Sequence, residues 1–310
     1  MAEQKKQSEY KWLVRILFLL VIIIAALFVF IWTGTMRCRS IPGGCNIYWS
    51  VMTLVTGKQQ PSVLILYDPT DQKGLGNPEL LKDLLTDRKG VAIHPTLADI
   101  RYLNSEQLKN VSLVIVEKSR KISTLQLMTM LNYISQGGRL VWIGDAGVEA
   151  DTDRGDMLYV GPENDRNNGW VRLTDTNRVI FFNRALGVNF VTNFCDVRDC
   201  HVGDKYTGKL MPSSDTHPLV YGLKSNLPIY DNYSIVTLIE PNPVPLKIDF
   251  GSNLRDTKNR AYGDIFDAIV TSNSNRVAYY AIPPEYLAEE RDGDNKYYSI
   301  VYNMFEGMVN

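Results

Sequence analysis

The sequence lacks an excess of charge of either sign. Its 33 Lys and Arg residues nearly balance its 34 Asp and Glu residues, and the formal net charge is -1. Proteins that bind nucleic acid neutralise phosphates with an excess of basic residues. The charge balance therefore argues against a nucleic-acid partner.

Nucleotide-binding motifs are missing too. The glycine-containing loop 68–76 has the spacing of neither a dinucleotide-binding fingerprint nor a Walker A loop. On this basis no cofactor is predicted, and the sequence contains no internal repeat. An apolar content of 45% with 22% charged residues is typical of a globular protein, which excludes a disordered or collagen-like chain.

Long aliphatic residues are concentrated near the N-terminus. Every residue from 16 to 32 is apolar, and the longer run 12–32 is interrupted only by Arg15. As a helix this run covers about 30 Å, the thickness of the hydrocarbon core of a bilayer. The sequence therefore predicts a tail over residues 1–11 and a transmembrane helix over residues 12–33. The lipid bilayer is the first expected partner.

Two other interpretations of this apolar run are weaker. A buried helix of a soluble protein would normally keep a polar stripe, and the run has none. A cleaved signal peptide has a shorter apolar region with small residues after it, whereas Ala25 and Ala26 lie in the middle of the run. The run is better explained as a permanent single-pass anchor.

Basic residues on the two sides of the run predict its orientation. More of them precede the helix than follow it, and the residues are Lys5, Lys6, Lys11 and Arg15 before it and Arg37 and Arg39 after it. Because basic residues favour the cytoplasmic side, we expect a cytoplasmic N-terminus and an extracytoplasmic C-terminal domain in the cell membrane.

Four cysteines form two pairs that are close in the sequence. Cys38 and Cys45 bracket a turn-forming segment, and Cys195 and Cys200 are also near neighbours. Two local disulfides are the simplest pairing, although four cysteines allow three pairings. Disulfides would indicate an oxidising compartment, in agreement with the expected topology. The alternative is a zinc site of Cys195, Cys200 and His201, but the paired short spacings of structural zinc modules are absent.

Residues 61–310 alternate between strand and helix patterns, after a connector over residues 34–60. Buried strands are expected at 63–67, 113–117 and 139–144, and helices begin near Pro78 and Ser123. This alternation predicts a three-layer α/β sandwich with a mostly parallel, doubly wound, flavodoxin-like sheet. An insertion is expected at about 145–215, and later elements are expected at 235–239, 268–270, 276–282 and 297–309.

In such sheets ligands bind beyond the carboxyl ends of the strands. The loops in that position make Asp68, Asp71, Glu117 and Asp145 candidate ligand-binding residues. His217 is added as a candidate base, although a histidine in a loop that caps a sheet more often has a structural role.

The turn 144–147 is the place where related architectures carry a nucleophile. It contains Gly144, Asp145, Ala146 and Gly147, so neither Cys nor Ser is present. No catalytic residue is therefore predicted.

An acidic segment follows this turn. Asp151, Asp153 and Asp156 are close enough in sequence to hold a hard cation such as Ca²⁺, but position 162 is not acidic, so no EF-hand loop is completed. No metal site is assigned, and calcium binding by this segment stays open.

The order of elements resembles the class I glutamine amidotransferase-like fold, in particular its branches that lack amidotransferase activity. These branches include ThuA-like proteins and accessory subunits of membrane transport systems. The resemblance spans about residues 61–310 and is carried by segments 63–68, 113–117, 137–144, 217–223 and 276–280. It implies the fold of the family, while the catalytic Cys of the family is not matched at the turn after Gly144.

These observations predict a single-pass membrane-anchored protein that binds or assembles with a partner and is not an enzyme. The expected partner is another protein or further copies of the same chain. Two alternatives remain, namely a hydrolase that uses Asp145 with His217, with or without a metal ion, and a structural subunit of an envelope complex.

Overall fold

The structure is a computed structural model that describes residues 2–32, 44–57, 60–87, 91–158, 169–174, 176–200, 206–214, 216–288 and 299–309. The chain divides into two compact units. The first contains Met1–Gln60 and Asp87–Ala92, and the second contains Pro61–Thr86 and Ile93–Asn310. Each unit is considered by itself.

The first unit contains two helices, α1 (Ala2–Trp32) and α2 (Gly44–Thr56). In α1 the apolar side chains of Leu17 and Phe18 are both 66% exposed. Among the helices of the described residues, none has the length and hydropathy needed to cross a membrane. Cys38 and the side chain of Cys45 lie outside the described residues, so the bridge predicted between them is not tested.

The second unit is built on a nine-stranded sheet with the order β12-β11-β14-β15-β16-β5-β3-β1-β2. Five neighbouring strands are parallel, namely β2 (Thr96–Asp99), β1 (Val63–Tyr67), β3 (Leu113–Val116), β5 (Leu140–Ile143) and β16 (Val277–Tyr280). The other four pair antiparallel, namely β15 (Ala261–Ser272), β14 (Leu246–Arg255), β11 (Gly208–Pro212) and β12 (Leu227–Ile229).

The parallel half of the sheet confirms the predicted α/β class. Its strand order is the flavodoxin-like one, with the chain moving outward from β1 in one direction and then in the other. The half beyond β16 differs from the prediction. There β14 and β15 are joined by the short segment 256–260, and a connection of this length permits only antiparallel pairing. The run predicted at 235–239 forms β13 (Ser234–Leu238), which pairs with β10 (Val188–Asn193) outside the main sheet.

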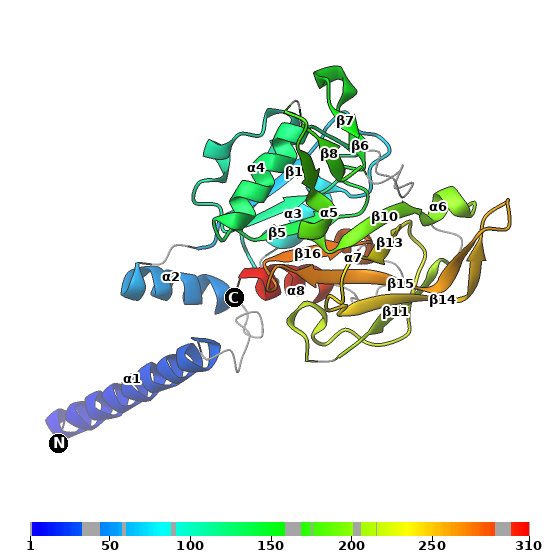
Figure 1. The fold of residues 1–310 in the computed structure, drawn as a ribbon. Coiled ribbons are helices and arrows are strands. Elements are labelled where there is room, and N and C mark those ends of the chain that lie inside the picture. Colours follow the sequence, from blue (N-terminus) through cyan, green and yellow to red (C-terminus); the bar gives the residue numbers. More distant parts are fainter. Residues whose placement is uncertain are drawn as a thin grey trace. The chain divides into compact units, whose positions relative to one another are not determined.

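Helices cover both faces of the sheet and form the outer layers of the sandwich (Figure 1). One face carries α4 (Thr124–Ser135) and α5 (Phe182–Leu186), and the other carries α3 (Pro78–Thr86), α7 (Pro284–Ala288) and α8 (Ser299–Val309). Side chains of a strand alternate between the two faces. Val116 and Trp142 therefore pack with Leu127 and Met130 of α4 in one core cluster.

Helix α4 begins where the sequence predicts it. The Ser123 hydroxyl accepts a hydrogen bond from the Gln126 N–H, and the Gln126 side chain accepts one from the Ser123 N–H, which forms a capping box. The helix stops before Gly137, whose φ of 95° suits glycine. This prediction succeeds because the signals at both ends are local.

Several small elements lie outside the nine-stranded sheet. Two strands, β4 (Lys121–Ile122) and β6 (Glu149–Ala150), pair in parallel. Three others form a separate antiparallel sheet, namely β7 (Met157–Leu158), β8 (Val171–Leu173) and β9 (Val179–Phe181). The short helix α6 (Phe194–Val197) follows β10, and the 3-10 turns are η2 (Ile100–Tyr102), η3 (Ser105–Leu108), η4 (Thr152–Arg154) and η5 (Pro218–Val220).

Candidate functional site

The loops after β1, β3 and β5 meet at the carboxyl edge of the parallel strands. Asp145 Oδ1, in the third loop, accepts a hydrogen bond from the Leu75 N–H in the first at 2.9 Å. Asp71 Oδ2, in the first loop, accepts from the Arg120 N–H in the second at 2.6 Å. The Lys118 N–H donates to the Leu75 carbonyl at 2.8 Å. Three of the predicted candidate loops are therefore tied into one structure.

Asp68 and Asp71 both act on the conformation of the loop that carries them. Asp68 Oδ1 accepts from the Thr70 N–H at 2.8 Å and from the Thr70 hydroxyl at 2.6 Å. Asp71 Oδ1 accepts from the N–H groups of Lys73 and Gly74, both at 2.9 Å. These bonds replace the backbone pairing that a loop lacks.

Asp145 is completely buried, and both of its carboxylate oxygens are occupied. Oδ2 accepts from the Asn193 side-chain amide at 2.9 Å and lies 3.5 Å from Arg120 Nε. Burial raises the pKa of Asp145, while the hydrogen bonds from Leu75 and Asn193 and the charge of Arg120 act in the opposite direction. An aspartate held in this way organises its surroundings and presents no oxygen to a substrate.

The turn 144–147 is filled by aromatic side chains. The indole N–H groups of Trp142 and Trp170 both donate to the Ala146 carbonyl, at 2.8 and 2.7 Å. The Tyr279 hydroxyl donates to the Gly144 carbonyl at 3.0 Å. Gly144 has a φ of 61°, and a Cβ atom at this position would lie 2.8 Å from the Cβ of Leu75. The turn is therefore packed from several sides by side chains of other elements.

Glu117 forms a buried pair with Glu285 of α7. Both residues are 0% exposed. Glu285 Oε1 accepts from the Asn77 N–H at 2.7 Å. Burial raises the pKa of each carboxyl group, and the charge of Glu285 raises that of Glu117 further. Sequence reasoning found Glu117 and missed Glu285, although the position of Glu285 after the last parallel strand points to the same edge.

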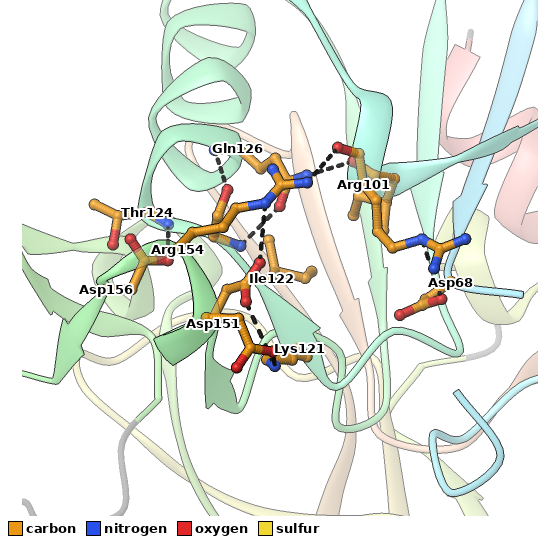
Figure 2. A network of polar contacts seen from close by, with 12 residues as sticks. Asp68, Arg101, Lys121, Ile122, Thr124, Gln126, Asp151, Arg154 and Asp156 are labelled. Atoms are coloured by element: carbon orange, nitrogen blue, oxygen red, sulfur yellow. Dashed lines mark hydrogen bonds and ion pairs between the residues drawn. The ribbon is translucent and has the colours of Figure 1, made fainter. Parts of the chain in front are cut away.

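Arg101 forms ion pairs with acidic residues that follow β1 and end β2, and Arg154 forms an ion pair with Asp151 (Figure 2). Arg101 Nη2 lies 2.6 Å from Asp99 Oδ2, and its Nε lies 3.5 Å from Asp68 Oδ1. The hydrogen bond from Arg101 lowers the pKa of Asp99. Arg154 Nη2 donates to the Arg101 carbonyl at 3.1 Å, which connects η2 to the acidic segment after β6.

The acidic segment considered for calcium forms ion pairs and a helix cap. Asp151 lies 3.4 Å from Lys121 Nζ, and Asp153 pairs with the same lysine. Asp156 Oδ2 accepts from the Thr124 N–H at 2.7 Å, at the start of α4 (Figure 2). In the part of the chain that the structure describes, no three His, Cys, Asp or Glu residues are grouped to hold a metal ion.

His217 lies in a separate network of hydrogen bonds. Its Nδ1 accepts from the Leu219 N–H at 3.3 Å and caps η5. Burial lowers its pKa. Within the described ranges no hydrogen bond or ion pair connects His217 to Asp145, so nothing in this geometry supports a hydrolase that pairs them.

Cys195 and Cys200 form a disulfide with a Cα–Cα distance of 5.3 Å. The prediction for this pair is confirmed, and a disulfide leaves neither sulfur as a thiolate for zinc. His201, the third member of the zinc alternative, lies outside the described residues. A cavity of about 410 Å³ lies beside the bridge, with Arg198 and Tyr206 among the residues that line it.

Arg172 is a buried cation that the sequence did not reveal as special. Its Nη2 donates to the carbonyl groups of Gly147 and Glu149 at 3.0 and 2.7 Å. Burial lowers its pKa to about 10. Arg172 therefore holds β8 against the turn after β5. No local sequence pattern indicates this role, because the role depends on strands that the fold brings together.

No protein-family model matches this chain, and none of the curated proteins matches it either. Similar solved structures include a putative ThuA-like protein from Bacteroides uniformis, with a TM-score of 0.48, 12% identity and coverage of 76% of this chain and 95% of that chain. PurLQS from Thermotoga maritima has a TM-score of 0.42 and 11% identity, and covers 80% of this chain and 100% of that chain.

A β-galactosidase from Bacillus circulans sp. alkalophilus is also similar, with a TM-score of 0.48 and 12% identity. That match covers 80% of this chain and only 30% of the galactosidase. Likenesses at these identities and TM-scores carry no conclusion about activity.

Proposed function

We propose that this chain is a single-pass membrane protein whose extracytoplasmic domain binds or assembles with a partner and performs no catalysis. The main observation in favour of a non-enzymatic role is the set of hydrogen bonds that Asp145 accepts. It occupies the turn where a nucleophile is expected, yet both of its oxygens accept hydrogen bonds from groups of the same chain. A residue engaged in this way supports a role for the edge of the sheet as a fixed surface.

The membrane part of the proposal rests on the sequence. Residues 16–32 are all apolar, and tryptophans stand at both ends of the longer run 12–32. The helices of the described residues give it no independent support, so it needs a direct test. A cytoplasmic N-terminus agrees with the basic residues before the run and with the disulfide between Cys195 and Cys200.

The anchor is tested by fractionation of cells that express the full chain. We expect the protein in the membrane pellet after carbonate extraction, and we expect protease added outside spheroplasts to digest the C-terminal domain. A variant with Ile22→Lys and Ile23→Lys places two charges in the middle of the run and is expected to leave the pellet. Wild-type protein that is extracted by carbonate as completely as this variant would contradict the anchor.

The binding role is tested by purification of the tagged full chain in mild detergent, followed by native mass spectrometry. We expect a stoichiometric complex with a second protein or a defined homo-oligomer. Recovery of monomer alone, under conditions where the Cys195–Cys200 bridge is intact, would contradict assembly.

The cavity beside the disulfide favours a second candidate, the binding of a small molecule. Its volume of about 410 Å³ lies in the range of ligand sites. Arg198 lies over the ring of Phe250, 5.1 Å from its centroid, which gives the cavity a cation and an aromatic surface. A small molecule retained in native mass spectra of the wild type and absent from those of Arg198→Ala would favour this candidate.

A further inference from the structure

The pair of Glu117 and Glu285 has too few hydrogen-bond donors for two charges. Both oxygens of Glu117 and Oε2 of Glu285 are buried and accept no hydrogen bond from a donor in the described residues. Of the four carboxyl oxygens, Glu285 Oε1 accepts a hydrogen bond from a described residue, through the Asn77 N–H at 2.7 Å. A buried carboxylate without donors is costly, so at least one carboxyl group of such a pair keeps its proton and donates it to the other.

The other titratable groups near the pair do not supply the missing donors, so the pair still has to keep a proton. Lys118 is the one cation whose charge acts on Glu117 in the described part of the chain, and it forms no ion pair there with either glutamate. Tyr286 of α7 lies beside Glu285, and the charge of Asp231 acts on that tyrosine. Tyr280 of β16 lies on the same face of the sheet as Glu117, and its hydroxyl is buried with no hydrogen-bond partner among the described residues.

The loop after β1 rests directly on the pair. The Asn77 N–H donates to Glu285, and the neighbouring Gly76 N–H donates to the Tyr286 hydroxyl at 2.9 Å. Gly76 has a φ of 123°, and a Cβ atom there would lie 2.4 Å from Glu117 Oε2. Because the loop backbone closes over both carboxyl groups, the loop must move before water reaches them.

We propose that Glu117 and Glu285 share a proton that latches the loop of residues 68–77 onto α7, and that loss of this proton releases the loop. This loop belongs to the candidate binding edge, so the latch would make the proposed binding surface sensitive to pH. The inference rests on the proposed function only in that respect, since the proton can be measured without any partner.

The number of protons released on opening determines how strongly the opening of the loop depends on pH. When the loop is closed, the pair retains a proton that a carboxyl group in water loses above pH ~4.5. Opening the loop releases this proton to solvent. The equilibrium constant for opening therefore rises about tenfold per pH unit for each proton released.

The test is hydrogen exchange of the full chain between about pH 5 and 7, measured by mass spectrometry on peptides that contain Gly76 and Asn77. After correction for the intrinsic pH dependence of exchange, we expect protection in the wild type to fall by about tenfold per pH unit. In Glu117→Gln the amide donates to Glu285 and does not ionise, so the fall is expected to be shallower. Glu106→Gln, at a side chain that is 72% exposed, is the control and should behave as the wild type does.

Protection that does not change with pH in the wild type would overturn the proposal, and so would a Glu117→Gln variant with the wild-type slope. Glu285→Gln keeps an acceptor for the Asn77 N–H and is expected to give a shallower slope as well. It replaces Glu117→Gln if that variant does not fold.

Infrared difference spectra at pH 7 provide an independent readout. The wild type minus Glu117→Gln is expected to contain the band of a protonated carboxylic acid, and the wild type minus Glu106→Gln is expected to contain none. If no such band is lost in Glu117→Gln, the shared proton does not exist. None of these results depends on whether a partner binds.

Discussion

At the scale of single residues, Asp145 shows how burial decides the role of a side chain. A carboxylate in a turn after a parallel strand is a reasonable candidate for chemistry on sequence alone. Here the turn is covered by Trp142 and Trp170, and the carboxylate is used to hold the Leu75 backbone and the Asn193 side chain. Asp145 therefore contributes to the stability of the carboxyl edge of the parallel strands.

Replacement of Asp145 should therefore lower the stability of the protein. We expect Asp145→Ala to lower the free energy of unfolding by about 2–4 kcal/mol, because two buried donors lose their acceptor and Arg120 loses a buried partner. Urea unfolding of the purified protein measures this loss. Asp153→Ala, at a side chain that is 83% exposed, should change stability by less than about 0.5 kcal/mol. Equal losses in the two variants would show that Asp145 is not structural.

At the scale of elements, the turn after β5 tests the importance of close packing. Gly144 and Gly251 both have positive φ angles, 61° and 81°. A Cβ atom at Gly144 would collide with Leu75, whereas none of the described atoms lies within 4 Å of one at Gly251. The two glycines therefore separate the cost of backbone strain from the cost of a clash.

We expect Gly251→Ala to cost about 1 kcal/mol from backbone strain alone, and Gly144→Ala to cost about 1–3 kcal/mol more because the loops after β1 and β5 must separate. Thermal unfolding of the two variants gives the difference. A Gly144→Ala variant no less stable than Gly251→Ala would mean that the two loops are not in firm contact.

The disulfide also acts at the scale of one element, since it closes the short loop between α6 and Cys200. The double variant Cys195→Ser with Cys200→Ser should be less stable by about 2 kcal/mol, the value expected for so short a loop. Reducing agent should lower the unfolding temperature of the wild type toward that of the variant, and should change that of the variant much less. A variant that responds to reductant as strongly as the wild type would assign the stabilisation to the predicted Cys38–Cys45 bridge.

The sequence predicted those parts of the fold that depend on local signals. Strands β1, β3 and β5 are continuous apolar runs, and α4 has a capping box and a terminal glycine. The antiparallel strands β11 and β12 lie at the far edge of the sheet and were not found, because their pairing depends on residues distant in the sequence. The partners Arg120, Asn193 and Glu285 were missed for the same reason.

At the scale of the whole molecule, the buried glutamates set a pH dependence of stability. Burial raises the pKa of Glu285 to about 7, above its ordinary value of 4.5. A group whose pKa is raised by folding stabilises the protein while it is protonated, and this stabilisation is lost as the pH rises through the folded value. Both members of the pair act in this direction.

We therefore expect the free energy of unfolding to fall between about pH 4.5 and 7, by about 1.4 kcal/mol per pH unit for each proton that the fold retains. Urea unfolding at a series of pH values measures this slope. Glu117→Gln should be more stable than the wild type at pH 8 and should have a smaller slope. An identical slope in wild type and variant would assign the dependence to other groups.

Asp71 and Asp145 accept hydrogen bonds from neighbouring loops, and these bonds affect how a partner would bind. While the loop of residues 68–77 is closed, a partner that docks on this edge meets a surface already fixed before contact, so little backbone entropy is lost on binding. Variants of the contact surface should then change the lifetime of the complex and leave the rate of its formation nearly the same.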